Sequence, residues 1–199
     1  MRAADLFCGC GGFSQGLKDL GIDVLLGVDC NRHALDVYEA NFDHETMCHD
    51  LSYVEPVVRR IQALGGVDIV AGSPPCQEFS SCGRQVETGR LSSLTERFGD
   101  VVAAVKPRIF VFENVPNVVH SVAYARLRVT LEALGYDIGV FTLNAKYAGT
   151  CQCRRRSFIC GAVGCADRIS LAQHELARRQ AMGKAAPPVT MRDILGDCC

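Results

Sequence analysis

Short apolar runs alternate along the chain with segments that have the spacing of amphipathic helices. The runs predict strands at 3–7, 22–28, 67–71, 109–112, 138–143 and 157–163, with a further short strand before Asp50. The helical spacing predicts helices at 13–20, 32–41, 54–64, 94–105 and 123–134. Nearly continuous apolar strands separated by helices are typical of parallel sheets buried on both faces. The predicted fold is therefore α/β, with a doubly wound, mostly parallel sheet.

Unusual residues gather where the predicted strands end. These places are the segment from Phe7 to Gly12, Asp29, Asp50, the segment 72–80 and Glu113 with Asn114. Ligands of parallel sheets bind beyond the carboxyl ends of the strands. We therefore expect the functional site at this edge. Beyond Gly164 the pattern weakens to a polar helix at 170–182 and a linker at 185–188, which predicts a domain at 1–164 and a tail at 165–199.

Composition and charge exclude several classes of protein. Hydrophobic residues make up 48% and charged residues 22% of the 199 residues, which excludes a disordered or collagen-like chain. The formal charge of −1 means that nucleic acid would be bound by local basic clusters and not by a global positive field. Asp5 lies where the apolar stretch of a signal peptide should be, so the start of the chain does not have a signal-peptide pattern. No apolar run approaches the ~20 residues of a membrane span. We expect an intracellular protein with no membrane partner, in the cytoplasm or nucleoid of a prokaryote or the nucleus of a eukaryote.

The chain has twelve cysteines at irregular spacing, which we interpret mostly as free thiols. A zinc site formed by Cys151, Cys153, Cys160 and Cys165 is the alternative. These residues lack the repeated C-x2-C spacing of a zinc ribbon, and Cys160 lies in an apolar run where a buried thiol is ordinary. We therefore predict no metal.

The glycine-rich turn after the first predicted strand has the spacing Gly9-x-Gly11-Gly12. Such a turn lets a ligand approach backbone N–H groups at a helix N-terminus, although glycines in these turns are often only steric. Asp29 ends the second predicted strand, where an acid often binds ribose hydroxyls, or it serves the helix N-cap near Asn31. Asp50 could accept from an adenine amino group or cap a turn.

Three further features carry chemistry. Cys76 follows two stiff prolines at a strand end and is a candidate nucleophile, although any one of twelve cysteines can be inert. Glu113 lies at the mouth of a buried strand, where a carboxyl with a raised pKa could protonate a base, or where it could turn to solvent. Arg154 and Arg156 would point to one side of a strand and could bind a phosphate or a base carbonyl, or could form a solvated edge.

Taken together and in this order, these segments resemble the cytosine-5 DNA methyltransferase family over about residues 2–163. The segments are Asp5-Leu6-Phe7-Cys8-Gly9-Cys10-Gly11-Gly12, Pro75-Cys76-Gln77 with Phe79-Ser80, Glu113-Asn114-Val115 and Gln152-x-Arg154-x-Arg156. The resemblance implies a fold of the S-adenosylmethionine-dependent methyltransferase type and S-adenosylmethionine as the cofactor. The implied cofactor contacts are Phe7, Gly9, Gly11, Gly12, Asp29, Asp50 and Pro74. Phe7 would stack on the adenine, Asp29 would bind the ribose and Asp50 the adenine amino group.

The resemblance also implies the reaction, because C5 of cytosine is too weak a nucleophile to attack a sulfonium unaided. The Cys76 thiolate would add to C6, Glu113 would hold or protonate N3, and Arg156 with Arg154 would hold the O2 carbonyl. The carbonyl of Pro75 would accept from the 4-amino group. The base would have to leave the DNA helix, and the implied substrate contacts are Pro75, Gln77, Ser80, Arg84 and Arg90.

The chain departs from the family in two places. It has 147-YAGTCQ-152, where the family usually has a segment one residue shorter with a proline. The stretch 189–195 resembles the one before the target-recognition region, and we expect that region and the C-terminal motifs to be absent. The resemblance implies double-stranded DNA as the substrate. Three explanations compete for the missing region: a second polypeptide that supplies target recognition, a truncated remnant, and a longer chain that has been cut. A tRNA cytosine-5 methyltransferase, and an inactive remnant or regulatory subunit, are the alternatives.

Overall fold

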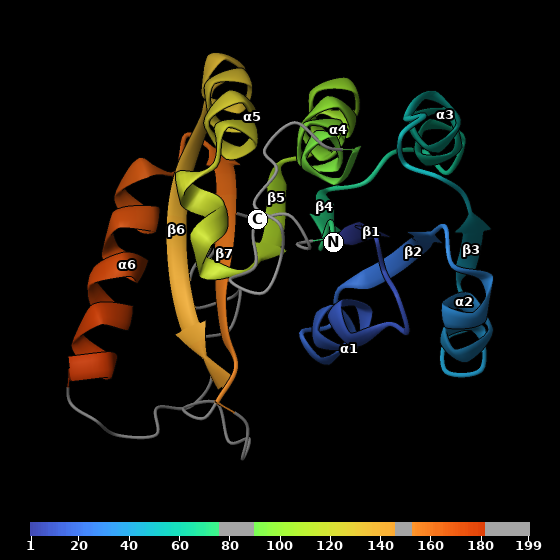
Figure 1. Cartoon of the computed structure of the whole chain (residues 1–199), viewed down its shortest axis with the longest axis horizontal. Coiled ribbons are helices and arrows are strands. Elements are labelled where there is room, and N and C mark those ends of the chain that lie inside the picture. The colour runs from blue at the N-terminus through green and yellow to red at the C-terminus, as the bar shows by residue number, and fades with distance from the viewer. Residues whose placement is uncertain (76–89, 146–152, 182–199) are drawn as a thin grey trace.

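The computed structural model describes residues 1–75, 90–145 and 153–181, and these form one seven-stranded sheet with helices on both faces (Figure 1). The strand order is β3-β2-β1-β4-β5-β7-β6. The strands are β1 (Arg2–Leu6), β2 (Asp23–Asp29), β3 (Glu45–Cys48), β4 (Ile69–Gly72), β5 (Ile109–Asn114), β6 (Tyr136–Asn144) and β7 (Arg155–Val163). The helices are α1 (Gly12–Asp19), α2 (Arg32–Glu39), α3 (Glu55–Ala63), α4 (Arg90–Val105), the 3₁₀ helix η1 (Pro116–His120), α5 (Val122–Ala133) and α6 (Ala166–Ala181).

The sheet is mostly parallel, which confirms the predicted fold class. The strands β1 to β5 pair with one another in parallel, whereas β7 runs antiparallel to both of its neighbours, β5 and β6. All seven predicted strands are present, within a few residues of the expected bounds. Parallel pairing places the carboxyl ends of β1, β2, β4 and β5 at one edge, and the antiparallel β7 brings its amino end to the same edge.

Two apolar layers bury the faces of the sheet. One layer packs α3, α4 and α5 on the sheet through residues such as Ile61, Phe98 and Leu127, each almost fully buried. The other layer includes Leu17 of α1 and Ile169 of α6. Figure 1 shows α3, α4 and α5 along one face of the sheet and α1 and α2 along the other. Among the described helices, none has the length and apolar character that crossing a membrane requires.

The C-terminal helix differs from the prediction. The sequence places it at 170–182, but it begins at Ala166 and packs against β6. Its buried residues Ile169, Ala172 and Leu176 form a narrow stripe at spacings of three and four within an otherwise polar sequence. This stripe is too narrow to stand out in the sequence, yet it joins the start of the predicted tail to the sheet. The helix η1 was also not predicted.

The cysteines in the described ranges are free thiols. Cys160 is fully buried in β7, and burial raises the pKa of its thiol to about 12, so it packs as an apolar residue. Cys165 is buried and Cys153 is exposed, while Cys151 lies outside the described residues. Within those residues, no cluster of three or more His, Cys, Asp or Glu side chains could hold a metal ion.

Replacement of Gly161 tests how closely β7 packs against Phe110 of the neighbouring strand β5. A Cβ added there would lie 2.0 Å from Cε1 of Phe110. We expect Gly161→Ala to lower the free energy of unfolding by about 1–3 kcal/mol through overpacking. The matched control is Gly16→Ala in α1, where the added Cβ meets nothing within 4 Å. This control should raise the same free energy by about 0.5–1 kcal/mol through helix propensity. Urea unfolding of both variants tests this, and equal effects would contradict the packing.

Candidate active site

The glycine turn after β1 has an unusual backbone conformation. Phe7, Gly9 and Gly11 all have positive φ, with values of 57°, 53° and 95°. Gly11 is the N-cap of α1, and a Cβ added there would lie 2.2 Å from Cε2 of Phe42, so only glycine fits. At Gly9 and Gly12 an added Cβ meets nothing within 4 Å. The turn is therefore packed tightly on one side and has open space on the other.

Asp29 ties the glycine turn to the end of β2. Its Oδ2 accepts a hydrogen bond from the N–H of Gly9 at 2.9 Å, and its Oδ1 accepts from the N–H of Asn31 at 2.8 Å. The N-cap of α2 is Asn31 itself, whose side chain accepts from the first turn of that helix. The alternative that Asp29 serves the helix N-cap near Asn31 agrees with these contacts: Asn31 is the cap, and Asp29 accepts from its N–H.

Asp50 lies beside Asp29 at the same edge of the sheet. Its Oδ1 accepts a hydrogen bond from the N–H of Ser52 at 2.9 Å. Burial raises the pKa of the Cys30 thiol, and the negative charges of Asp29 and Asp50 add to this effect. Both carboxylates therefore lie near Cys30. The ends of β2 and β3 thus bring together two acids that the sequence predicted as ribose and adenine ligands.

A buried acid lies beneath the turn, and the sequence analysis gave it no role. Asp5 on β1 is fully buried, and its Oδ2 accepts a hydrogen bond from Oγ of Ser14 at 2.7 Å. The backbone of Ser14, in the first turn of α1, also bonds to this carboxyl group. Burial raises the pKa of Asp5 to about 7. Its position inside an apolar strand was the available signal.

The second half of the site forms where β5 and β7 pair. Glu113 lies opposite Phe158 and Asn114 opposite Ser157 in the antiparallel register. This register sets Nε of Arg156 3.0 Å from Oε1 of Glu113, with the two side chains only 23% and 17% exposed. The prediction that Glu113 and Arg156 act at one place is consistent with this ion pair.

Burial and the neighbouring cations act in opposite directions on the pKa of the Glu113 carboxyl group. Burial raises its pKa, while the charges of Arg156 and Arg154 and a hydrogen bond from the Ser73 side chain act in the opposite direction. The net shift is upward. Arg154 is exposed just before β7, and its charge acts to lower the pKa of Glu113. Ser73, at the end of β4, is a contact that the sequence analysis missed.

Asn114 fixes the chain just before Cys76. This side chain is 2% exposed, and its Nδ2 donates to the carbonyl oxygen of Pro74 at 3.1 Å. Its Oδ1 accepts from the N–H of Val115 at 2.8 Å. Pro74 is buried and Pro75 is half-buried. Asn114 was part of a recognised motif but received no role, since the contact with Pro74 requires β4 and β5 to be adjacent.

Several predicted site residues cannot be placed. Cys76, Gln77, Ser80 and Arg84 lie outside the described residues. Arg90 begins α4, and its backbone alone is described. The predicted residues that the structure brings together therefore form two groups at one edge, a turn with two acids and an acid with two arginines.

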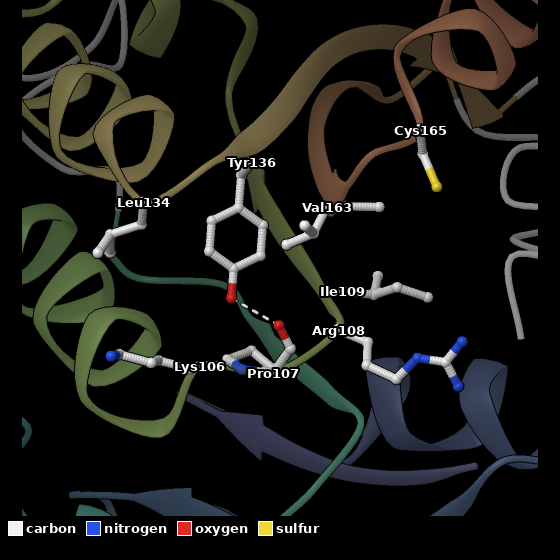
Figure 2. A pocket seen from close by; sticks show the side chains of 9 residues that line it. Lys106, Pro107, Arg108, Ile109, Leu134, Tyr136, Val163 and Cys165 are labelled. Carbon is white, nitrogen blue, oxygen red and sulfur yellow. Dashed lines mark hydrogen bonds between the residues drawn. The ribbon is translucent and has the colours of Figure 1, made fainter.

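A separate pocket lies at the opposite edge of the sheet (Figure 2). Its lining includes Lys106 and Arg108 before β5, Tyr136 at the start of β6 and Val163 at the end of β7. The Tyr136 hydroxyl donates to the carbonyl oxygen of Pro107 at 2.5 Å. This pocket contains none of the predicted site residues, because those that the structure describes lie at the carboxyl ends of the parallel strands and at the amino end of β7.

Comparison with known proteins decides the family. A family model described as C-5 cytosine-specific DNA methylase matches residues 1–197. The chain belongs to this family. A type II methyltransferase of Herpetosiphon aurantiacus is 32% identical over 199 residues, and one of Haemophilus influenzae is 31% identical over 198. Each match covers 99% of this chain but 62% of the relative, so the chain spans less than two thirds of their length.

Solved structures support the methylase fold. A structure titled as a DNA modification methyltransferase encoded within an E. coli prophage aligns with a TM-score of 0.69 and 28% identity, over 82% of this chain and 47% of that one. The S. pombe Dnmt2 methyltransferase aligns with a TM-score of 0.68 at 22% identity, over 82% and 49% of the two chains. The resemblance that the sequence motifs indicated is confirmed.

Replacement of Asp5 tests its burial as an acid. Because its pKa is raised above the unfolded value of 3.8 to about 7, the folded state favours the protonated form. The stabilisation is complete below about pH 4 and is lost as the pH rises through about 7, a change on the order of 4 kcal/mol. Asp5→Asn should remove this slope from the free energy of urea unfolding. The exposed acid of α1 gives the control, Asp19→Asn, and a slope that survives in Asp5→Asn would contradict the assignment.

Replacement of Asn114 tests how the chain before Cys76 is held. Asn114→Ala leaves the buried carbonyl of Pro74 and the N–H of Val115 without their partner, which should cost about 1–3 kcal/mol of unfolding free energy. The control Asn117→Ala removes an exposed amide from η1 and should change little. Thermal or urea unfolding gives the comparison, and equal stability of the two variants would rule out this role.

Proposed function

We propose that this protein transfers a methyl group from S-adenosylmethionine to C5 of cytosine in DNA. The observation that carries the proposal is the half-buried ion pair of Glu113 and Arg156, beside the strand end that leads into Pro75 and Cys76. A carboxyl group with a raised pKa next to a guanidinium offers a proton donor and a forked donor at one place. These are the groups that N3 and the O2 carbonyl of a cytosine require.

The glycine turn, together with Asp29 and Asp50, fits the cofactor. The open face of the glycine turn offers backbone to the amino-acid end, and the Asp29 carboxylate offers further acceptor lone pairs to ribose hydroxyls. Asp50 lies one strand further along and would accept from the adenine amino group. Phe7 is half-buried at the start of the turn and would stack on the adenine ring. When bound, the cofactor supplies a methyl group on a sulfonium.

The proposed chemistry begins with Cys76. Its thiolate forms a bond to C6 of cytosine, while the Glu113 carboxyl holds or protonates N3 and Arg156 holds the O2 carbonyl. The ring then has enamine character, and C5 would form the new bond to the methyl carbon as the bond from that carbon to the sulfonium sulfur breaks, which would leave S-adenosylhomocysteine. Loss of the C5 proton to solvent, return of any N3 proton to Glu113 and breaking of the sulfur–C6 bond restore the aromatic base and release the Cys76 thiolate. Arg154, near Glu113, adds positive charge that favours the thiolate and the electron-rich ring.

The base must leave the DNA helix to reach this edge. Pro75, Gln77, Ser80, Arg84 and Arg90 are proposed to contact the extruded nucleotide and its phosphates. We propose DNA as the substrate because the family is described as a DNA methylase and its type II methyltransferase relatives cover nearly the whole chain. The target-recognition region would be supplied by polypeptide outside residues 1–199, as a continuation or a second chain.

The test is transfer of labelled methyl groups from S-adenosylmethionine to duplex DNA and to tRNA, with and without a polypeptide that carries a recognition region. Transfer to DNA is expected, and Cys76→Ser should abolish it. Glu113→Gln should lower the rate by about 10²–10⁴-fold, since the proton donor is lost. The control is Cys165→Ala, which changes a buried cysteine at the opposite edge. Transfer to tRNA alone would contradict the DNA substrate, and activity that survives Cys76→Ser would contradict the mechanism.

A further inference from the structure

A chain of hydrogen bonds runs from beneath the glycine turn toward the molecular surface. It starts at the buried Asp5 carboxyl group, 2.7 Å from Oγ of Ser14. The Ser14 Oγ is 2.5 Å from the Tyr38 hydroxyl, which in turn is 2.6 Å from Nε2 of His44. Three elements, β1, α1 and α2, and the loop before β3 each contribute one residue. The proposed reaction uses none of the four.

The surrounding packing holds this chain in place. The Tyr38 side chain is fully buried, and a Cβ added at Gly27 would lie 2.7 Å from its Cζ. On the side of the glycine turn, a Cβ added at Gly11 would lie 3.0 Å from its Cδ2. Phe42 packs on the ring with centroids 4.7 Å apart. The hydroxyl of Tyr38 is therefore confined between β2 and the turn that Gly11 shapes.

The number of protons in the chain limits its states. Three hydrogen bonds join the four side chains, but the two hydroxyl groups supply only two protons. The third proton comes either from the Asp5 carboxyl group or from Nε2 of His44. When Asp5 loses its proton, Ser14 donates to Asp5, Tyr38 donates to Ser14, and His44 must carry a proton on Nε2. When Asp5 carries its proton on Oδ2, every bond reverses, Nε2 becomes an acceptor, and the neutral His44 ring takes a proton from solvent on Nδ1.

We propose that Tyr38 and His44 are positioning residues that share one proton with Asp5, and that this shared proton sets how the glycine turn holds the cofactor. The link to the cofactor rests on the proposed function. The carboxylate form of Asp5 accepts from both Oγ and the backbone of Ser14, which fixes the first turn of α1 against β1. Oδ1 of Asp5 has no hydrogen-bond partner in the described part of the chain.

The groups around Asp5 and His44, the two ends of the hydrogen-bond chain, set the balance between its two protonation states. Burial raises the pKa of Asp5 to about 7, and the neighbouring charge of Asp29 acts in the same direction. Burial lowers the pKa of His44, where the charges of Asp23 and Asp43 oppose it and Lys18 reinforces it. The Cys8 thiol and the Tyr38 hydroxyl also face Asp5, and burial raises the pKa of both, so neither ionises near pH 7.

The test is a pH titration by NMR of protein labelled with ¹³C at aspartate carboxyl groups and ¹⁵N at histidine. In the unmodified protein, the Asp5 carboxyl signal and the tautomer signal of His44 Nε2 should change with one common midpoint. Tyr38→Phe keeps the ring and removes the link, so the two midpoints should separate by at least half a pH unit. The matched controls Tyr53→Phe and His33→Gln change exposed side chains outside the chain of bonds and should leave the midpoint in place.

Separate midpoints in the unmodified protein, or a common midpoint that survives Tyr38→Phe, would overturn the shared proton. Addition of S-adenosylmethionine tests the link to the cofactor. Its net positive charge should favour ionised Asp5 and lower the common midpoint by at least half a unit. Binding that leaves the midpoint unchanged would overturn the link. Failure of the unmodified protein to bind S-adenosylmethionine would contradict the proposed function instead, and the titration of the free protein would still decide the shared proton.

Discussion

The antiparallel pairing of β7 with β5 is the constraint on which the site depends. A parallel strand at this position would carry its amino end, and so the arginines, to the far edge of the sheet. Because β7 reverses, Arg156 meets Glu113 at the edge where β4 leads toward Cys76. A one-residue slip in the register would turn Arg154 and Arg156 to the other face of the sheet and break the ion pair of Arg156 with Glu113.

The same edge gathers two kinds of chemistry side by side. The ends of β1, β2 and β3 present backbone and carboxylate acceptors, which suit an adenosine with a cationic amino-acid arm. The ends of β4 and β5 with the start of β7 present a carboxyl group and guanidinium groups, which suit a flat polar base. The strand order places β1 next to β4, so the two halves are adjacent and a group could pass directly between their ligands.

Local patterns were enough to predict the strands and the motifs, because apolar runs and glycine turns are encoded within a few residues. Contacts that depend on strand order could not be predicted from such local patterns. The bond from Asn114 to Pro74, the Ser73 contact with Glu113 and the burial of Asp5 under α1 all join segments that are distant in sequence or hidden inside an apolar run. The start of α6 at Ala166 was missed because only a narrow stripe of its residues meets the sheet.

Covalent trapping on DNA tests the proposed bond between Cys76 and C6 of cytosine most directly. A duplex with 5-fluorocytosine in place of cytosine has no C5 proton to lose, so the bond between the cysteine sulfur and C6 should persist after methyl transfer. A protein–DNA adduct should form only with S-adenosylmethionine, and peptide mass spectrometry should map it to Cys76. An adduct at another cysteine, or methyl transfer to normal duplex without any trapped adduct, would contradict the proposed bond.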